Sequence, residues 1–289
     1  MVKIDKKKSI QLFVSLIVTG IFLYLFEIYV GFEKFILLFK SLSLIHLVIG
    51  IVLYTFSYII RSIRWSLTLD IKEFGKLFKI TVFNTFFNII LPFRVGEISF
   101  FYMLKKEGIS LTQTTMSFIT TRIFDGLSLI GFFSLFYFLY KSNLILGVLT
   151  FFISPFIFIP ISLLIKKIKH QEIVNYHSKL EVKNLLNIYI LSVLTLIFKF
   201  SAFYFVLPPD IKLSISEAFL AFSAGDLTTV LPIHGIAGIG TYESGYAGSL
   251  LVLGVSRDIA LLSALFTHTF ILFSSSILAF LTYIFSKKL

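Results

Sequence analysis

The sequence contains no cysteine, and only 14% of its 289 residues are charged. Without cysteine the chain can form no disulfide and can hold no cysteine-ligated metal. The charged fraction is too small for a soluble globular protein, in which about a quarter of the residues are charged. A disordered chain is excluded as well, because disorder requires low hydrophobicity together with high charge.

The chain is instead rich in apolar residues, with 57% hydrophobic letters, 17% aromatic letters and a mean hydropathy of +0.95. Six apolar runs reach the length of about 20 residues that a helix needs to cross a bilayer. They are Ile10 to Val30, Leu42 to Ile60, Thr115 to Tyr140, Leu144 to Ile165, Leu185 to Leu207 and Ile259 to Phe285. The first run is too long for a signal peptide and lacks a small-residue cleavage site. The sequence therefore predicts an all-α integral membrane protein.

Two further apolar stretches, about Leu77 to Leu104 and Ser214 to Leu253, are interrupted by proline and glycine. Such a stretch either crosses the membrane or enters and returns on the same side. If both return and the N-terminus is cytoplasmic, 18 of the 26 lysines and arginines lie on the cytoplasmic side and 5 lie outside. This split satisfies the positive-inside rule. We therefore predict six spanning helices, two re-entrant broken helices and two cytoplasmic termini, in the cell (cytoplasmic) membrane.

This topology also explains the net charge of +11, which in a soluble chain would suggest nucleic acid. The basic residues label one side of the membrane, so we expect no nucleic-acid partner. Three basic residues lie within apolar segments and are not explained by topology: Arg94, Arg122 and Lys199.

The two interrupted stretches are related in sequence. Leu91-Pro92-Phe93-Arg94 and Leu231-Pro232-Ile233-His234 align at an offset of 140 residues. Glu97 aligns with Glu243, and Thr121-Arg122 with Thr267-His268, at an offset of 146 residues. Each copy has three crossings, so the second copy must be inverted. We predict one transmembrane domain of two inverted-topology repeats, about 1–142 and 143–289. Such repeats with matching broken helices are typical of transporters with a midplane site.

Ionisable side chains at the centre of a bilayer cost at least about 2.5 kcal/mol each, so they usually face a protein interior or a cavity. The candidates in this chain are Arg94, Glu97, Arg122, Asp125, Lys199, Asp226, His234, Glu243 and His268. Arg122 and Asp125 stand three residues apart on a helix, so we expect them to pair. They form either a structural ion pair or a phosphate site in which Asp125 orients the Arg122 guanidinium.

At each break, the backbone N–H groups that begin the next half-helix form an anion site. Arg94 or His234 would add positive charge there, and Gly235, Gly238 and Gly240 would let the backbone approach a ligand closely. The alternative is that proline and glycine only kink a helix.

The sequence leaves two alternative roles open for the carboxylates of Glu97 and Glu243 and for the amine of Lys199. Glu97 and Glu243 either titrate, coupling transport to protons, or pair with basic residues. Lys199 either finds a partner or extends its amine toward the outer surface.

The segment Arg61-Ser62-Ile63-Arg64-Trp65 ends the second run at the cytoplasmic face. Arginine and tryptophan there are ordinary interfacial anchors, or else Arg61 and Arg64 gather lipid phosphates at a cavity mouth. His234, Glu243 and His268 contain the donors of a two-histidine, one-carboxylate metal site, but their spacing is not diagnostic. No catalytic motif is present, so we expect no enzyme, no metal and no cofactor.

The ordered set of motifs resembles a known family. The motifs are Arg61-x-x-Arg64-Trp65, Asn88-x-x-Leu91-Pro92-x-Arg94-x-Gly96-Glu97, Arg122-x-x-Asp125, and Leu231-Pro232 through Gly238-x-Gly240-x-x-Glu243. From about residue 10 to 285 the chain resembles the flippase-like transmembrane family typified by the membrane half of lysylphosphatidylglycerol synthases. The chain ends at Leu289 without a soluble aminoacyl-transfer domain, so lysyl transfer is not expected of it.

The resemblance implies movement of a lipid, a lipid-linked sugar or an aminoacyl headgroup between leaflets. It implies functional roles for Arg61, Arg64, Arg94, Glu97, Arg122, Asp125 and Glu243. We therefore expect a flippase-like transporter that moves a phospholipid, aminoacyl-lipid or polyprenyl-phosphate-linked headgroup through a midplane cavity. The alternatives are a proton- or ion-coupled solute transporter, a membrane enzyme acting on lipid phosphates, and a structural partner of a glycosyltransferase or lipid synthase.

Overall fold

In a computed structural model of the chain, which describes residues 6–91, 96–157, 182–229 and 235–286, every regular element is a helix. The helices are α1 (Lys6–Tyr29), α2 (Phe32–Ser41), α3 (Leu44–Ser66), α4 (Phe74–Ile90), α5 (Gly96–Lys106), α6 (Leu111–Tyr140), α7 (Leu144–Ile153), η2 (Ser154–Ile157), α10 (Val182–Val206), α11 (Ile215–Thr228), η3 (Ile236–Gly238), α12 (Thr241–Val252) and α13 (Arg257–Ser286). The prediction of an all-α protein is confirmed.

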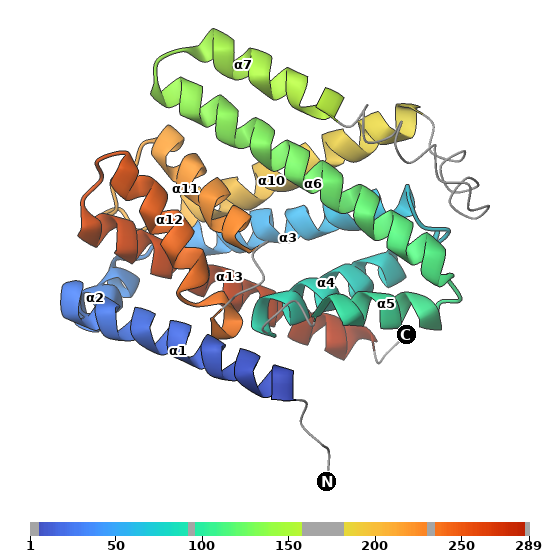
Figure 1. Cartoon of the computed structure of the whole chain (residues 1–289), viewed down its shortest axis with the longest axis horizontal. Helices are drawn as coiled ribbons and strands as arrows, with labels where there is room; N and C mark the ends of the chain where they lie inside the picture. Colours follow the sequence, from blue (N-terminus) through green and yellow to red (C-terminus); the bar gives the residue numbers. More distant parts are fainter. Residues whose placement is uncertain (1–5, 92–95, 158–181, 230–234, 287–289) are drawn as a thin grey trace.

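Five of these helices are long and apolar enough to cross a membrane: α1 from Leu12, α3, α6, α10 from Lys183, and α13. They run roughly lengthwise through the molecule, α3 and α13 in one direction and α1, α6 and α10 in the other (Figure 1). The sixth predicted span, Leu144 to Ile165, is described only as far as Ile157, where α7 and η2 form a shorter apolar segment. The chain is therefore a multi-pass membrane protein.

The first interrupted stretch folds as an antiparallel hairpin of α4 and α5. Gly96 begins α5 directly against the end of α4, and a Cβ atom there would lie 2.2 Å from the backbone nitrogen of Asn88, so only glycine fits. At the other end of the hairpin, Lys76 Nζ lies 3.1 Å from Glu107 Oε2. Hydrogen bonds that Lys76 donates to Glu107 and Glu73 raise its pKa above the ordinary value. The chain thus leaves the hairpin close to where it entered.

The second interrupted stretch forms a similar hairpin of α11 and α12. Ser214 begins α11 with a capping box, in which its hydroxyl and backbone N–H reach the Glu217 carboxylate and the hydroxyl accepts the Glu217 N–H. Gly225 on α11 lies against the Tyr242 ring on α12, and a Cβ at Gly225 would be 2.7 Å from Cε2 of that ring. Before α12 the backbone takes positive φ at Gly238 (80°) and Gly240 (89°), which glycine adopts without strain.

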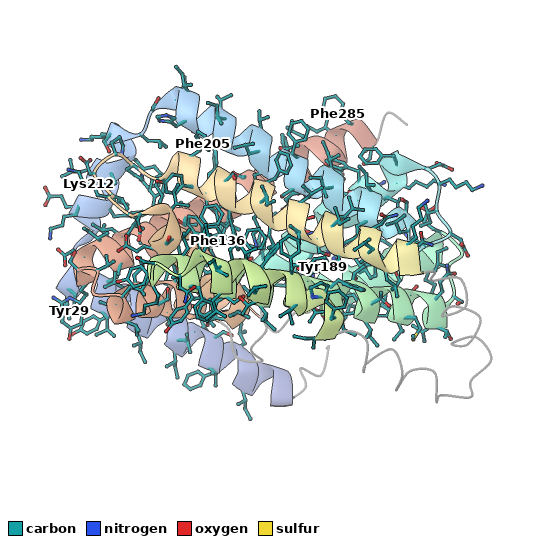
Figure 2. All side chains as sticks on the ribbon, turned by 90° about the horizontal axis from the view of Figure 1, so that it is seen from above. Tyr29, Phe136, Tyr189, Phe205, Lys212 and Phe285 are labelled. Carbon is teal, nitrogen blue, oxygen red and sulfur yellow. The ribbon has the colours of Figure 1, made fainter. Side chains whose placement is uncertain are left out.

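The two hairpins enter from opposite ends of the molecule, and their tips meet near its middle (Figure 1). Contact between α4 and η3 joins the two tips. Helix α13 lies beside them in the interior, with 61% of its apolar window buried, whereas only 11% of the α1 window is buried. Figure 2 shows Tyr29 and Lys212 together at one end of the helix layer, where the spans are connected by short segments. This arrangement places the interrupted stretches, and the polar residues they carry, at the centre of an apolar protein.

The core around the second hairpin is aromatic. Phe200 and Phe203 of α10 pack against Phe222 of α11, with ring centroids 5.6 and 5.4 Å apart. Phe222 in turn lies 5.8 Å from Tyr246 of α12. These rings are fully buried and hold α11 and α12 against the long helices.

Candidate functional site

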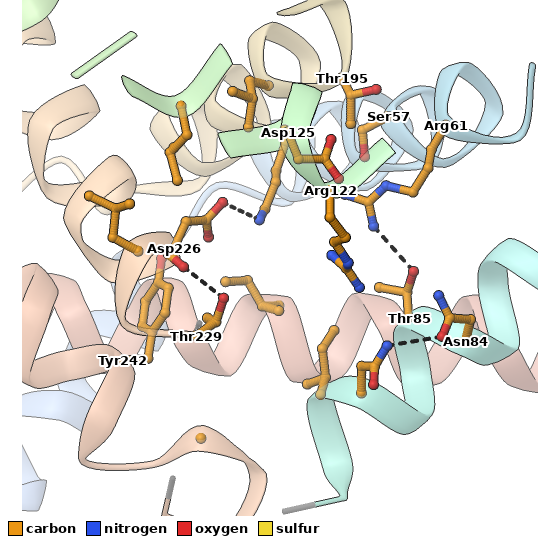
Figure 3. A pocket seen from close by; sticks show the side chains of 18 of the residues that line it. Ser57, Arg61, Asn84, Thr85, Arg122, Asp125, Thr195, Asp226, Thr229 and Tyr242 are labelled. Atoms are coloured by element: carbon orange, nitrogen blue, oxygen red, sulfur yellow. Dashed lines mark hydrogen bonds and ion pairs between the residues drawn. The ribbon is translucent and has the colours of Figure 1, made fainter. Parts of the chain in front are cut away.

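A cavity of about 550 Å³ lies between the tips of the two hairpins (Figure 3). Its volume falls within the range of small-ligand sites, about 300–1,000 Å³. The wall is built from α3, α4, α5, α6, α10, α11, α12, α13 and the η3 loop. Charged residues in this wall include Arg61, Glu97, Arg122, Asp125, Lys199 and Asp226. Most of the residues predicted to carry the site are therefore brought to one place.

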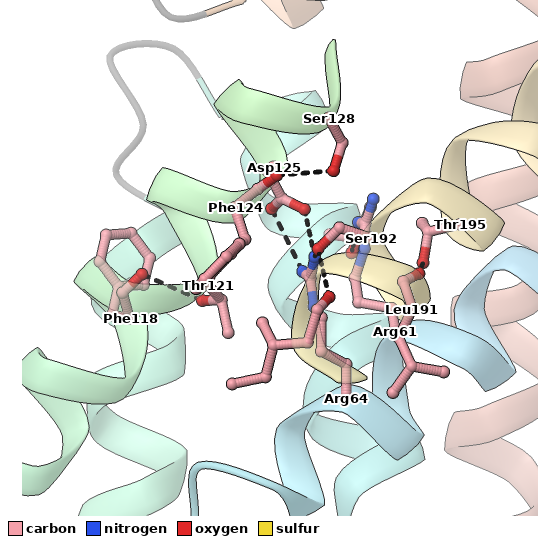
Figure 4. A network of polar contacts seen from close by, with 12 residues as sticks. Arg61, Arg64, Phe118, Thr121, Phe124, Asp125, Ser128, Leu191, Ser192 and Thr195 are labelled. Atoms are coloured by element: carbon pink, nitrogen blue, oxygen red, sulfur yellow. Dashed lines mark hydrogen bonds and ion pairs between the residues drawn. The ribbon is translucent and has the colours of Figure 1, made fainter. Parts of the chain in front are cut away.

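Arg64 is buried behind this wall and clamps three helices together. Its side chain is 1% exposed. Both terminal nitrogens donate to the Asp125 carboxylate of α6, and Nη1 also donates to Ser192 Oγ of α10 at 2.5 Å (Figure 4). The expectation of an interfacial anchor or a phosphate-gathering group is wrong for Arg64, because its guanidinium is enclosed and already paired. Trp65 is also buried, with its ring 4.5 Å from that of Phe100.

The predicted pair of Arg122 and Asp125 is replaced by two other pairs. Asp125 is paired with Arg64, and Nη2 of Arg122 lies 3.7 Å from Oε1 of Glu97. The guanidinium carbon of Arg122 also lies 4.9 Å from the centre of the Phe118 ring. The Arg122 side chain is 41% exposed, so it reaches into the cavity from a loose contact with Glu97. The spacing of three residues places Arg122 and Asp125 on one face of α6. Each of them nevertheless pairs with a residue of another helix.

Glu243 and His268 form a tight buried pair. Oε1 of Glu243 lies 2.6 Å from Nδ1 of His268, and their side chains are 0% and 5% exposed. Oε2 of Glu243 accepts the N–H of Gly240 at 2.7 Å. Gly238 lies beside the other ring nitrogen, since a Cβ there would be 3.5 Å from Nε2. The structure thus brings together four predicted site residues, Gly238, Gly240, Glu243 and His268, at the tip of the second hairpin.

Lys199 does not extend outward. Its Nζ lies 2.6 Å from Oδ2 of Asp226, and the two side chains are only 16% and 12% exposed. Of the two alternatives for Lys199, the structure shows the one with a partner, because Asp226 at the end of α11 offers a carboxylate within the protein.

Arg61 is the exception to this pattern of pairs. Its Nη1 donates to Thr85 Oγ1 at 3.2 Å, and the side chain lines the cavity. In the described ranges no carboxylate lies within ion-pair distance of Arg61. Among the described residues, this end of the cavity wall holds Arg61 and Arg122 with Glu97 and Asp125, and Arg64 lies behind it, paired with Asp125 (Figures 3 and 4). A local excess of positive charge results.

Two predicted residues, Arg94 and His234, lie outside the described residues. Sequence reasoning also missed polar residues of the wall. Asn88 Nδ2 donates to Asn84 Oδ1 at 2.9 Å, and Tyr242 lies beside Asp226 (Figure 3). The four-residue spacing of the two asparagines, directly before the first break, was an available signal.

A family model described as the lysylphosphatidylglycerol synthase TM region matches residues 12–279. The match covers both hairpins, the first four of the five long apolar helices from Leu12 on, and α13 as far as residue 279. No curated protein and no solved structure matches the chain.

Proposed function

The chain belongs to the lysylphosphatidylglycerol synthase transmembrane family, and on that premise we propose that it carries a lipid headgroup between leaflets. The headgroup phosphate binds in the cavity between the hairpin tips, while the acyl or prenyl tails stay in the surrounding lipid. The chain then acts as a flippase-like transporter and performs no chemical step on its cargo.

The observation that carries this proposal is the excess of arginine at one end of the cavity. Guanidinium groups bind phosphate through two parallel hydrogen bonds, and they stay charged at any physiological pH. Among the described residues, Arg61 has a hydroxyl as its hydrogen-bond partner and no carboxylate within ion-pair distance. Its guanidinium can therefore bind a phosphate without breaking an ion pair in the described part of the chain, and Arg122 lines the same cavity. Arg64 keeps Asp125 neutralised, so that this carboxylate does not repel the ligand.

The topology we propose has both hairpins re-entrant, six spans and two inverted repeats. The closeness of Lys76 and Glu107 supports re-entrance of the first hairpin, because both of its ends lie at the same end of the molecule (Figure 1). The repeat is supported by two pairs at one offset, Glu97 with Arg122 and Glu243 with His268. The distribution of lysine and arginine supports cytoplasmic termini in the cytoplasmic membrane.

Lipid exchange in reconstituted liposomes tests the function. A fluorescent phosphatidylglycerol in both leaflets is quenched from outside, and the fraction quenched in protein-containing vesicles reports transfer between leaflets. We expect Arg61→Gln and Arg122→Gln each to slow exchange by about 10-fold or more. This is the effect of losing one hydrogen bond from a charged group, which contributes about 1.5–3 kcal/mol.

The matched control is Lys34→Gln, which removes a basic residue whose pair with Asp258 is exposed and is not part of the cavity wall. Its exchange rate should equal that of the unmodified chain. The proposal is wrong if the unmodified chain does not exceed empty vesicles, or if the Arg61→Gln, Arg122→Gln double variant exchanges lipid at the unmodified rate.

A further inference from the structure

The end of the cavity opposite Arg61 is built differently from the arginine end. It is formed by Lys199 of α10, Asp226 of α11 and Tyr242 of α12 (Figure 3). Lys199 and Asp226 are paired at 2.6 Å, so together they contribute no net charge. They still offer hydrogen bonds, because the ammonium has further N–H groups and the contact uses only Oδ2 of Asp226. This end presents donors and an acceptor on a neutral surface.

Tyr242 adds a buried hydroxyl that has no partner. The side chain is 4% exposed, and its hydroxyl makes no hydrogen bond with any described residue. The ring is fixed by His268, with ring centres 4.9 Å apart, and by Gly225, which leaves room for its edge. Phenylalanine would fill the same space without burying an unsatisfied polar atom. A ligand in the cavity that forms a hydrogen bond with the Tyr242 hydroxyl would explain why this position carries tyrosine.

The position of Tyr242 separates it from the other unpartnered hydroxyls. Within the described ranges the buried hydroxyl oxygens without a partner also include those of Ser223, Tyr246, Thr267 and Ser274. None of these four lines the cavity, whereas Tyr242 does. Tyr246, on the same helix and fully buried, therefore serves as an internal comparison.

The chemistry of the two ends selects one class of headgroup. A ligand hydroxyl both donates and accepts, so it can satisfy Tyr242 and the Lys199–Asp226 pair together. Because Lys199 already neutralises Asp226 and Arg61 has no carboxylate partner in the described ranges, an ammonium group in the cavity would meet net positive charge. Resting on the proposed function, we propose that the cavity recognises a phosphate headgroup bearing neutral hydroxyls, such as a glycerol or a sugar, and that Tyr242 selects for those hydroxyls.

Competitive lipid retention measured by native mass spectrometry of the full chain tests this proposal. Phosphatidylglycerol and phosphatidic acid with identical acyl chains are offered in equal amounts. They share the phosphate, but only the first carries glycerol hydroxyls. We expect phosphatidylglycerol to be retained about fivefold more than phosphatidic acid, because one additional hydrogen bond contributes about 1 kcal/mol. Tyr242→Phe should bring this ratio to about one, and Tyr246→Phe should leave it unchanged.

A third lipid, phosphatidylglycerol esterified with lysine, tests the exclusion of an ammonium group, and it should be retained less than phosphatidylglycerol itself. The inference is overturned if phosphatidic acid or the lysyl lipid is retained as well as phosphatidylglycerol, or if Tyr242→Phe and Tyr246→Phe act alike. Those outcomes would leave the proposed function, binding of a lipid phosphate in the cavity, uncontradicted. If neither anionic lipid is retained above phosphatidylcholine, the proposed function fails together with the inference.

Discussion

Nδ1 of His268 lies 2.6 Å from Oε1 of Glu243, although 25 residues separate them and they belong to different helices. Glu97 and Arg122, which are paired at 3.7 Å, have the same separation in the first half of the chain. In both cases the carboxylate stands in the first turn of the second hairpin helix, and its partner stands in the long helix that follows. Each pair therefore joins a hairpin tip to a spanning helix at the edge of the cavity, tightly in the second half and loosely in the first.

Replacement of Glu243 by alanine should strongly destabilise the protein. It leaves His268 buried without its partner and the N–H of Gly240 without an acceptor. Leaving a buried hydrogen-bonding group without its partner costs about 1–3 kcal/mol for each group. The free energy of unfolding in detergent, followed by circular dichroism, measures the effect. Lys34→Ala, which breaks an exposed pair, should lose no more than about 1 kcal/mol. Equal losses in the two variants would show that the Glu243–His268 pair is not structural.

Replacement of Gly96 by alanine should open the first hairpin. The added Cβ would lie 2.2 Å from the nitrogen and 2.7 Å from the Cα of Asn88, and backbone atoms cannot move aside as a flexible side chain can. Gly75→Ala is the matched control, because nothing lies within 4 Å of a Cβ there, and alanine favours a helix over glycine by about 1 kcal/mol. Thermal unfolding should separate the two variants, with Gly96→Ala lowered and Gly75→Ala unchanged or raised. A Gly96→Ala protein as stable as the Gly75→Ala protein would contradict the close approach of α4 and α5.

Much of the helix pattern could be predicted from the sequence, because the bilayer imposes long apolar runs and proline and glycine interrupt them. The five long apolar helices all lie within or close to the predicted runs, and the breaks fall near Pro92 and Pro232 as expected. The glycines of the second turn and the aligned residues Glu243 and His268 also come together as candidate site residues.

The partners of the charged residues could not be predicted in the same way. Arg122 and Asp125 share a helix face, but Asp125 is held by Arg64, which lies 61 residues earlier. Lys199 is alone in its apolar run, yet Asp226 reaches it from another helix. Spacing along one helix reports only local neighbours, whereas these pairs depend on how helices distant in sequence pack together.

Arg64 and Arg61 should respond differently to replacement by lysine. Arg64 holds both oxygens of Asp125 and also Ser192, a geometry that a single ammonium cannot reproduce. We expect Arg64→Lys to lower the free energy of unfolding by about 1.5–3 kcal/mol. Arg61→Lys, whose only hydrogen-bond partner in the described part of the chain is Thr85, should change stability by less than about 1 kcal/mol. The reverse order would place the structural clamp at Arg61.

The absence of cysteine allows the topology to be tested with single cysteines. Glu73 directly precedes α4 and Glu107 directly follows α5; both are exposed, and these ends of the two helices lie at the same end of the molecule (Figure 1). Lys141, directly after α6, and Lys212, between α10 and α11, are exposed in connections at the other end (Figure 1). In sealed vesicles of one orientation, a membrane-impermeant maleimide should label Glu73→Cys and Glu107→Cys from one side, and Lys141→Cys and Lys212→Cys from the other.

The unmodified chain, which has no thiol, gives the background of this labelling. Labelling of Glu73→Cys and Glu107→Cys from opposite sides would mean that the first hairpin crosses the membrane. The inverted repeat would then be wrong, because the first half would contain an even number of crossings. Labelling from the same side means that the first hairpin enters and returns on one face of the membrane, as the arrangement with one midplane site accessible from either leaflet requires.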